Sequence, residues 1–530
     1  MNRPLGLAFS ICLALAAQSR GQSPEAAKAD SGIRFGEGAL FAGAVVLPVL
    51  ENRVLKAGEA LARPGMPGLR ISEVPGPPGG TVDDVSRINP TPVDSVRLPA
   101  TEEEIREALA YARARHLRVS MAGARHSQGG QIVYDNNVVL DMIRFNRFDV
   151  DKEKKILTVQ SGARWIDIQR SLDGQGLSLD VIQTHNIFSV GGSLSVNAHG
   201  SNPNSGPVGS TVLSMRIMLA DGRVVNASRE ENPELFHAAI GGYGMVGVML
   251  DIRIRLRDNE LYGVEGEMVD VDGFPEYFAK NIKGDPRVRY VHSLLSTAPS
   301  SFLKTVSVMK YVSRGDGDVP PMDGKKLEEL KSAFFNKTFF LAKSKWGQEL
   351  FWLMSGRLAP KLASLWRFSR NQAMSEPMIA FHSNDPKETQ ILNEYFLPPE
   401  RFPEFVDRLR SAVLKHGATL TMAAARGVAA DNDAMLPYAP EDRLALVLFF
   451  NQKISPEENE KMAAMTRELI AACIELGGRF YLPYQLVYSD VQLRKAYPDM
   501  ERFIEVKRKY DPEETFMNKW YAKYASGKVQ

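Results

Sequence analysis

The segment SMAGARHSQGGQ, at residues 120–131, is a turn of small and polar residues that contains three glycines. It lies between RVSMAG and NNVVLDM, and both stretches have the composition of short β-strands. A glycine-rich turn between two strands constrains the backbone strongly, and this one also carries His126. Any fold assigned to the chain has to explain what the turn holds and why a histidine stands in it.

A second turn of this kind occurs in SVGGSLSVNAHGSNPNSGPVGS, at residues 189–210. Glycine and serine leave backbone N–H groups bare, and successive bare N–H groups form a concave site for an anion. A pair of ordinary tight turns is the alternative, but it does not explain the polar residues within both segments. The two turns together therefore indicate a large ligand that carries phosphate.

The segment before the first turn, TEEEIREALAYARARHL, predicts a capped amphipathic helix. Thr101 is the expected N-cap, and Glu104 follows three residues later. Ile105, Leu109 and Ala112 then fall on one stripe. Further strands are predicted in KILTVQSG, STVLSMRIMLADGRVV and VGVMLDIRIRL, with helices in WIDIQRSLDGQG and PELFHAAIGG, which makes residues 93–256 an α+β region.

The hexapeptide GYGMVG, at residues 242–247, matches the dinucleotide-binding pattern GxGxxG letter for letter. That pattern needs a strand before it and a helix after it. Here a helical ELFHAAI precedes the glycines and the alternating VGVMLDIRIRL follows them. The order is reversed, so we do not expect a Rossmann fold.

The chain has 530 residues, which is too long for one ordinary core. Its start has Arg3 ahead of a short apolar run that ends in small residues, as in a signal peptide, and we expect residues 1–22 to direct export to the periplasm or medium. A buried N-terminal helix is the alternative. Cleavage would leave Cys473 as the sole cysteine. Residues 23–92 are expected to form a Pro/Gly-rich extension, with neither helix nor strand persisting over residues 61–92 and order resuming at Val93.

Several classes of function are disfavoured. The formal net charge of +2 gives no reason to expect nucleic acid. His126, His185 and His199 lack the spacing of metal ligands, so no metal site is expected. The sequence has neither a GxSxG elbow nor a Walker loop, which removes the commonest hydrolase and NTPase patterns.

Taken in order, GARHSQGG, SVGGSLSVNAHG, GGYGMVGVMLDIRIRL and KYDPEETFMN resemble the FAD-linked oxidases of the vanillyl-alcohol oxidase and p-cresol methylhydroxylase superfamily. In that family the first turn wraps the FAD pyrophosphate, and a histidine at the position of His126 is often bonded covalently to the flavin. A histidine that only hydrogen-bonds the cradle is the alternative. The resemblance implies these FAD contacts: Gly123, Ala124, Arg125, His126, Ser127, Gln128, Gly191, Gly192, Ser195, Asn197, His199, Gly200, Gly247, Val248 and Asn518.

The second half resembles the substrate domain of the alditol and aldonolactone oxidases, through LNEYFLPPERFPEF, AAARGVAADNDAMLPYAPEDRLALVLFF and GGRFYLPYQ. Ala424 stands where the family has the glutamate of a Glu-x-Arg pair, and Arg426 remains. Val447 replaces a family histidine, and YLPY at residues 481–484 replaces His-Trp-x-Lys. These departures put a polyol substrate in doubt.

The resemblance implies an α+β fold with a two-part FAD-binding domain and a separate cap. We expect the FAD-binding domain at residues 93–260, a substrate (cap) domain at residues 261–485 built on an antiparallel sheet with covering helices, and a C-terminal segment at residues 486–530 that returns to the FAD domain.

The expected activity is FAD-dependent oxidation of a small molecule, a sugar, lactone or related alcohol, by hydride transfer from a CH–OH group to flavin N5. Tyr484 or Glu394 is the expected base, with Arg426 and Gln485 orienting the substrate. The resemblance leaves the acceptor open among oxygen, a quinone and a cytochrome.

Two other functions stay open. One is an FAD-dependent reductase of a carbon–carbon double bond that uses NADPH. The other is a peripheral membrane protein without catalysis, because residues 325–370 hold ten Lys or Arg and nine Phe or Trp at helical spacing. Cap helices with solvated lysines are the alternative interpretation of that region.

Overall fold

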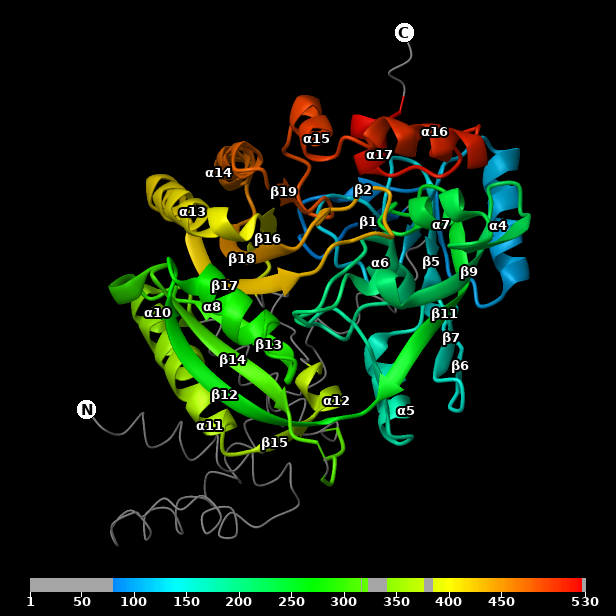
Figure 1. The fold of residues 1–530 in the computed structure, drawn as a ribbon. Coiled ribbons are helices and arrows are strands. Elements are labelled where there is room, and N and C mark those ends of the chain that lie inside the picture. Colours follow the sequence, from blue (N-terminus) through cyan, green and yellow to red (C-terminus); the bar gives the residue numbers. More distant parts are fainter. Residues whose placement is uncertain (1–79, 316, 323–340, 376–384, 527–530) are drawn as a thin grey trace, which may run out of the picture.

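The computed structural model describes residues 80–315, 317–322, 341–375 and 385–526. These residues form an α+β part at the N-terminal side and a second part built on a broad antiparallel sheet, as Figure 1 shows. The predicted signal peptide and residues 23–79 of the predicted extension lie outside the described residues.

Order begins before Val93, which corrects the expected start of the folded region. Strands β1 (Thr81–Val82) and β2 (Thr91–Pro92) pair as a short antiparallel hairpin. Between them the buried carboxylate of Asp84 accepts a hydrogen bond from the Gly130 backbone N–H at 2.9 Å. The Val85 N–H donates to the Arg125 carbonyl at 3.0 Å. Tertiary contacts with the first glycine turn thus order a segment whose composition favours irregular backbone.

The first sheet is parallel and is built from β3 (Ser95–Arg97), β4 (Val119–Ala122) and β5 (Val138–Asp141), in the order β3-β5-β4. The predicted helix is confirmed as α4 (Glu102–Ala114), whose N-cap Thr101 accepts from the Glu104 N–H and whose stripe is buried. It connects β3 to β4, as a crossover between parallel strands must. The glycine turn at residues 120–131 therefore starts within β4 and continues beyond its carboxyl end.

The second sheet of this part is antiparallel, in the order β10-β9-β11-β7-β6 with β8 paired to β11. Its strands are β6 (Phe148–Asp151), β7 (Ile156–Gln160), β8 (Leu177–Leu179), β9 (Val212–Met218), β10 (Val224–Ser228) and β11 (Val248–Asp258). The helices are α5 (Trp165–Asp173), α6 (Val190–Ser195) and α7 (Pro233–Ala239). GYGMVG lies after α7 and before β11, which confirms that it is no Rossmann fingerprint.

The second glycine-rich segment differs from the expected open turn between strands. Its first residues form the short helix α6, and Ser189 is the N-cap. Gly191 lies so close to β7 that a Cβ there would meet the Cβ of Ser161 at 2.6 Å. A small residue is therefore required for α6 to pack against the end of that strand.

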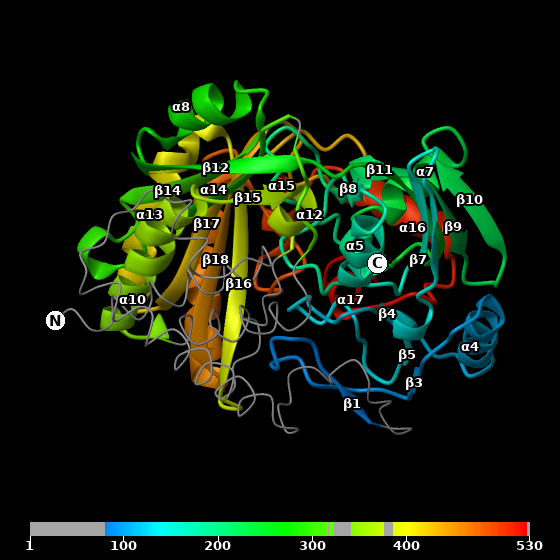
Figure 2. The ribbon, with the colours of Figure 1, turned by 90° about the horizontal axis from the view of Figure 1, so that it is seen from below.

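The cap sheet is antiparallel throughout, in the order β15-β12-β14-β13-β17-β18-β16-β19. Its strands are β12 (Leu261–Asp270), β13 (Val288–Leu295), β14 (Thr305–Ser313), β15 (Arg367–Ser369), β16 (Glu388–Leu397), β17 (Thr419–Val428), β18 (Arg443–Lys453) and β19 (Arg479–Phe480). The longest helices beside it are α13 (Phe402–His416) and α14 (Pro456–Glu475), while α8 (Phe274–Phe278), α10 (Lys345–Phe351), α11 (Ala359–Ala363) and α12 (Arg370–Ala373) are short. Figures 1 and 2 show helices covering this sheet, as predicted.

The C-terminal helices return to the first part of the molecule. They are α15 (Asp490–Ala496), α16 (Met500–Tyr510) and α17 (Lys519–Tyr524). Helix α16 packs on α7 of that part, and Phe516 forms a bridge with Val119 of β4.

The described portion of the basic aromatic region, residues 341–370, does not form one uniform exposed face. Phe351 and Trp352 are each 4% exposed and Arg370 is 1% exposed, so these residues belong to the core. Trp346 is 68% exposed. Residues 325–340 lie outside the described residues. No helix of the described residues is long and apolar enough to cross a membrane.

Candidate active site

One deep cavity runs between the two parts of the molecule and encloses about 1380 Å³ of empty volume, its open mouth included. The first part contributes both glycine-rich segments, and the cap contributes strand residues and the turn after β19. Fourteen of the nineteen predicted site residues line the cavity: Gly123, Ala124, Arg125, His126, Ser127, Gly191, Gly192, Ser195, His199, Gly247, Val248, Glu394, Arg426 and Tyr484.

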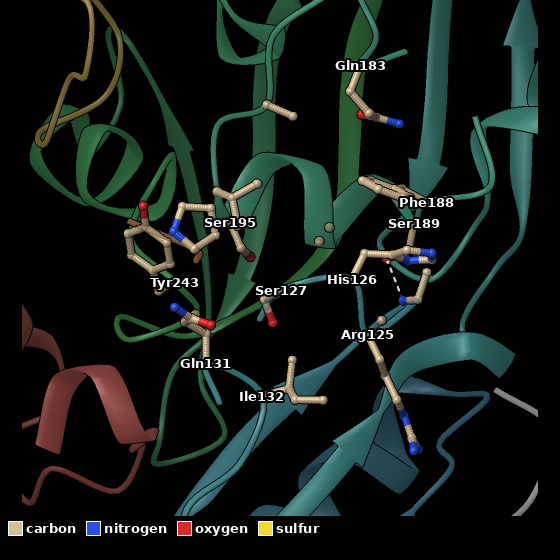
Figure 3. Close-up of a pocket in the computed structure, with 18 of the residues that line it drawn as sticks. Arg125, His126, Ser127, Gln131, Ile132, Gln183, Phe188, Ser189, Ser195 and Tyr243 are labelled. Carbon is tan, nitrogen blue, oxygen red and sulfur yellow. Dashed lines mark hydrogen bonds between the residues drawn. The ribbon is translucent and has the colours of Figure 1, made fainter. Parts of the chain in front are cut away.

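The two glycine-rich segments lie against each other along one wall. A Cβ on Gly123 would come within 2.0 Å of the Ser189 Oγ, and a Cβ on Gly192 within 2.9 Å of the same atom. The Ser189 hydroxyl in turn accepts a hydrogen bond from the Ala124 N–H at 3.4 Å, drawn as a dashed line in Figure 3. Glycine at these positions therefore lets both backbones approach the same space.

Arg125 contributes its backbone to the cavity rather than its charge. Its φ is +57°, so the chain turns sharply here. Its guanidinium donates to the buried Asp141 carboxylate at 2.5 Å, and Figure 3 shows it directed away from His126. The neighbouring charge offsets part of the effect of burial, which raises the pKa of Asp141. The Arg125–Asp141 ion pair therefore holds the turn in place on the side directed away from His126.

His126 lies at the centre of the wall. Its ring stacks on Phe188, with centroids 4.1 Å apart and planes inclined by 29°. Figure 3 shows the two rings one above the other on the cavity side of the turn. A stacked imidazole has a fixed orientation, which a group that bonds to a single ligand atom needs.

Three buried hydroxyls line the cavity without a hydrogen-bond partner among the described residues: Ser127 Oγ, Ser161 Oγ and Thr184 Oγ1. Buried polar groups are normally paired, because an unpaired one costs free energy. A polar ligand in the cavity would satisfy all three. The hydroxyls and the close-packed glycine backbone fit a bound FAD.

Across the cavity, the cap contributes a buried carboxylate. Glu394 on β16 is 4% exposed, and its Oε1 lies 2.6 Å from His199 Nε2. The other imidazole nitrogen, Nδ1, lies 3.1 Å from the Gly200 carbonyl, which can only accept. Nδ1 is therefore the protonated nitrogen, and the short Nε2–Oε1 contact must contain a proton of its own.

Tyr484 completes this cluster by donating its hydroxyl proton to Glu394 Oε2 at 3.3 Å. Burial, together with the Glu394 charge, raises the pKa of Tyr484 well above its ordinary value. Burial likewise raises the pKa of Tyr481, whose hydroxyl donates to the Val196 carbonyl at 2.8 Å. Both phenols are thus hydrogen-bond donors at neutral pH.

Arg426 on β17 lines the cavity at the same end as Glu394. Within the described part of the chain its guanidinium takes part in no ion pair or hydrogen bond, and its charge lowers the pKa of Tyr484. It is the cation available to an anionic or carbonyl group of a ligand.

Two residues predicted at the site, Gln128 and Gln485, make structural contacts instead. The Gln128 side chain donates to the Gln390 carbonyl and accepts from the Leu392 N–H, both at 2.8 Å. Gln485 donates to the Gln128 carbonyl. These contacts tie the first glycine turn to the edge of β16, so both amides act outside the cavity.

Three further residues predicted to contact FAD, Asn197, Gly200 and Asn518, do not line the cavity. Asn197 donates to Asp431 and accepts from the Gly209 N–H, at 2.8 and 3.0 Å. Gly200 packs on the Ile182 carbonyl, 2.5 Å from where its Cβ would stand. Asn518 donates to the carbonyls of Gln131 and Tyr243, at 2.9 and 3.2 Å, and joins the C-terminal segment to the turn.

The structure adds cavity residues that the sequence patterns did not single out as cofactor or substrate contacts. They include Gln131, Met142, Ser161, Gln183, Thr184, His185, Phe188, Tyr243, Leu392 and Phe449. Residues 183–188 immediately precede the second glycine-rich segment. Their position next to that segment is the sequence signal that could have identified them as cavity residues. Among the described residues no group of three His, Cys, Asp or Glu could hold a metal ion.

The fold and the cavity together define a flavoprotein with a cap domain. The FAD binding domain family matches residues 93–228, and the D-arabinono-1,4-lactone oxidase family matches residues 320–524. Residues 93–228 are thus similar to FAD binding domains and residues 320–524 to D-arabinono-1,4-lactone oxidases, and the FAD-binding match makes FAD the cofactor.

Individual relatives match over part of their length. L-gulonolactone oxidase of Mus musculus is 32% identical over 158 residues, 30% of this chain and 36% of the relative. Mitochondrial L-galactono-1,4-lactone dehydrogenase of Arabidopsis thaliana is 27% identical over 175 residues, 33% of this chain and 29% of the relative. The structure of 6-hydroxy-D-nicotine oxidase from Arthrobacter nicotinovorans shares the fold, with a TM-score of 0.58 and 16% identity over 86% of this chain and 95% of that one.

Proposed function

We propose that this protein is an FAD-dependent oxidase or dehydrogenase that oxidises a CH–OH group of a lactone, sugar or related alcohol. The observation that carries the proposal is the continuity of one cavity, which joins the turn around His126 to Glu394 and Arg426 on the cap. The aldonolactone oxidases among the relatives support this class of donor.

The reaction needs a hydride acceptor, a base and a group that orients the donor. FAD, when bound, accepts a hydride from the donor carbon. A CH–OH group becomes a carbonyl only if its hydroxyl proton leaves as well, so the protein must supply a base. Glu394 is that base, because it lines the cavity and because burial raises the pKa of Tyr484, so that the phenol does not ionise easily. Arg426 orients the donor by charge-assisted hydrogen bonds.

His199 holds the Glu394 carboxyl group in place through the Nε2–Oε1 contact. With Nδ1 protonated, the pair exists either as imidazolium and carboxylate or as imidazole and carboxylic acid. In the first form the carboxylate takes up the hydroxyl proton at Oε2, while His199 keeps Oε1 hydrogen-bonded. His199 is therefore a positioning residue for the base.

We further propose that His126 holds the flavin covalently. The orientation of the ring against Phe188 supports this, as does the resemblance of GARHS to the family's tether. A covalent bond would raise the flavin's potential and would prevent loss of the cofactor outside the cell.

The test of the proposed activity is anaerobic bleaching of the yellow holoprotein. We expect at least one compound from a panel of aldonolactones, sugars, polyols and amines to bleach the flavin within the time of mixing and observation. Bleaching by NADPH alone would identify the protein as a reductase instead. A holoprotein that no member of the panel reduces would contradict the proposal.

Two proposals concern where the protein works. Residues 1–22 direct export, so the mature N-terminus should lie between about residues 19 and 23 by mass spectrometry; Met1 on exported protein would contradict this.

Residues 325–370 bring the cap to anionic lipid, and the exposed Trp346 supports that contact. Failure to sediment with anionic vesicles at low salt would remove it.

A further inference from the structure

Three neighbouring strands of the cap sheet place their side chains in regular rows along the cavity. The register pairs Ala424 on β17 with Val447 on β18, and Val447 with Glu394 on β16. Residues directly opposite one another on antiparallel strands share a face of the sheet. These three therefore form one row, in which Glu394 is the polar member.

The next row, two residues along each strand, is apolar throughout. It pairs Met422 with Phe449, and Phe449 with Leu392. Side chains two residues apart point to the same face, so this row continues the first one. We call Leu392, Met422, Ala424, Val447 and Phe449 the apolar wall.

The apolar wall is buried and belongs to one hydrophobic cluster, to which Phe188 and Tyr484 are packed. Leu392, Val447 and Phe449 reach the cavity directly. Arg426 shares the face of Ala424 two residues further along β17, away from the second row. The polar groups of the cap, Glu394 and Arg426, thus lie at one end of the rows. The other end, formed by the second row, has only apolar side chains.

This distribution of polar and apolar side chains favours donors with an apolar body over donors with many hydroxyl groups. A hydroxyl buried against Leu392, Val447 or Phe449 would lose its water without gaining a partner, which is unfavourable. A methyl or ring carbon in the same place would gain from leaving water.

We infer that the donor has an apolar body and that its polar groups are confined to the end that reacts. The inference rests on the proposed function and narrows its substrate class to alkyl- or aryl-bearing alcohols and hydroxylactones. Glu394, Arg426 and Tyr484 then meet the hydroxyl and the adjacent carbonyl, while the apolar wall holds the body.

Two lactones provide a matched probe. Pantolactone and D-arabinono-1,4-lactone share the five-membered ring and the 2-hydroxyl, but pantolactone has two methyl groups at C3 and no further hydroxyl. Their dissociation constants for the holoprotein are measured by titration calorimetry under nitrogen. We expect pantolactone to bind about tenfold more tightly, because a methylene in an apolar pocket changes selectivity by about that factor. Equal or tighter binding of the arabinonolactone, or no binding of pantolactone, would overturn the inference.

The variant Val447→Thr adds a hydroxyl to the wall at nearly constant volume. It should reduce the ratio of the two dissociation constants at least threefold. Val308→Thr on β14 is the control, since Val308 is equally buried in the same sheet but does not line the cavity; the ratio should not change there. A ratio unaffected by Val447→Thr counts against the inference.

Failure of this inference is distinguishable from failure of the proposed function. If pantolactone binds more tightly but no compound bleaches the flavin, the apolar site stands and the activity is wrong. If the arabinonolactone binds more tightly and bleaches the flavin, the activity stands and the inference is wrong.

Discussion

Nε2 of His199 lies 2.6 Å from Oε1 of Glu394, although 195 residues separate the two in sequence. One belongs to the second glycine-rich segment and the other to a cap strand, so the contact joins the two parts of the molecule inside the cavity. Both side chains are 4% exposed. The buried contact holds the Glu394 carboxylate in one position, and a general base must be positioned within reach of the proton that it removes.

Replacing that carboxylate should abolish most of the activity without loss of the cofactor. Glu394→Gln keeps the shape of the side chain but cannot take up a proton, so flavin reduction should slow by about 100-fold or more. The measurement is the anaerobic bleaching rate with the best donor, alongside the visible spectrum of bound FAD. Glu388→Gln, on the same strand but outside the cavity, is the control. If Glu394→Gln reduced the flavin at the wild-type rate, Glu394 would not be the base and another group would have that role.

Arg426 should matter for turnover and not for the yellow colour. Arg426→Ala removes the cation that faces the donor, and hydrogen bonds to charged groups contribute about 1.5–3 kcal/mol, so kcat/KM should fall about 10- to 100-fold. The comparison is with Lys453→Ala, which removes an exposed cation from β18. Steady-state kinetics that do not change in Arg426→Ala would exclude the residue from the site.

Asp84 should give the folded state a pH dependence. Burial raises the pKa of its carboxyl to about 6, against an ordinary value of 3.8. Between these pH values the folded chain holds more protons than the unfolded one, so the free energy of unfolding should fall as pH rises from about 4 to 6. Asp84→Asn should flatten this dependence while lowering the stability, because the amide meets donors from Ser86 and Gly130.

Thermal unfolding at several pH values measures the effect. The melting temperature of the wild type minus that of Asp84→Asn should decrease from pH 4 to pH 6. Asp149→Asn, at an exposed carboxylate, should leave the wild-type profile in place. A constant difference across the range would mean that the Asp84 carboxyl is ionised throughout.

The local part of the fold was accessible from the sequence because it depends on neighbouring residues. Thr101 caps α4 as expected, and the reversed order around residues 242–247 excluded a Rossmann fold. The meeting of His199 with Glu394 was not accessible, since no local pattern encodes a contact between distant segments. Gln128 and Gln485 illustrate the same limit: both flank site residues in sequence, yet their side chains bond to backbone outside the cavity.

His126 provides the last prediction, which concerns the bond to the flavin. If the imidazole is attached to the cofactor, acid-precipitated wild-type protein should stay yellow, and His126→Ala should release its FAD into the supernatant. The variant should still fold and bind FAD, because the surrounding cradle is built from the glycine backbone and from Ser127, Ser161 and Thr184. Its flavin potential should be lower, since loss of the covalent bond lowers it. His185→Ala removes another histidine from the same cavity and is the matched control; its pellet should remain yellow. A colourless wild-type pellet, with all of the flavin in solution, would refute the covalent bond and leave the FAD-binding fold intact.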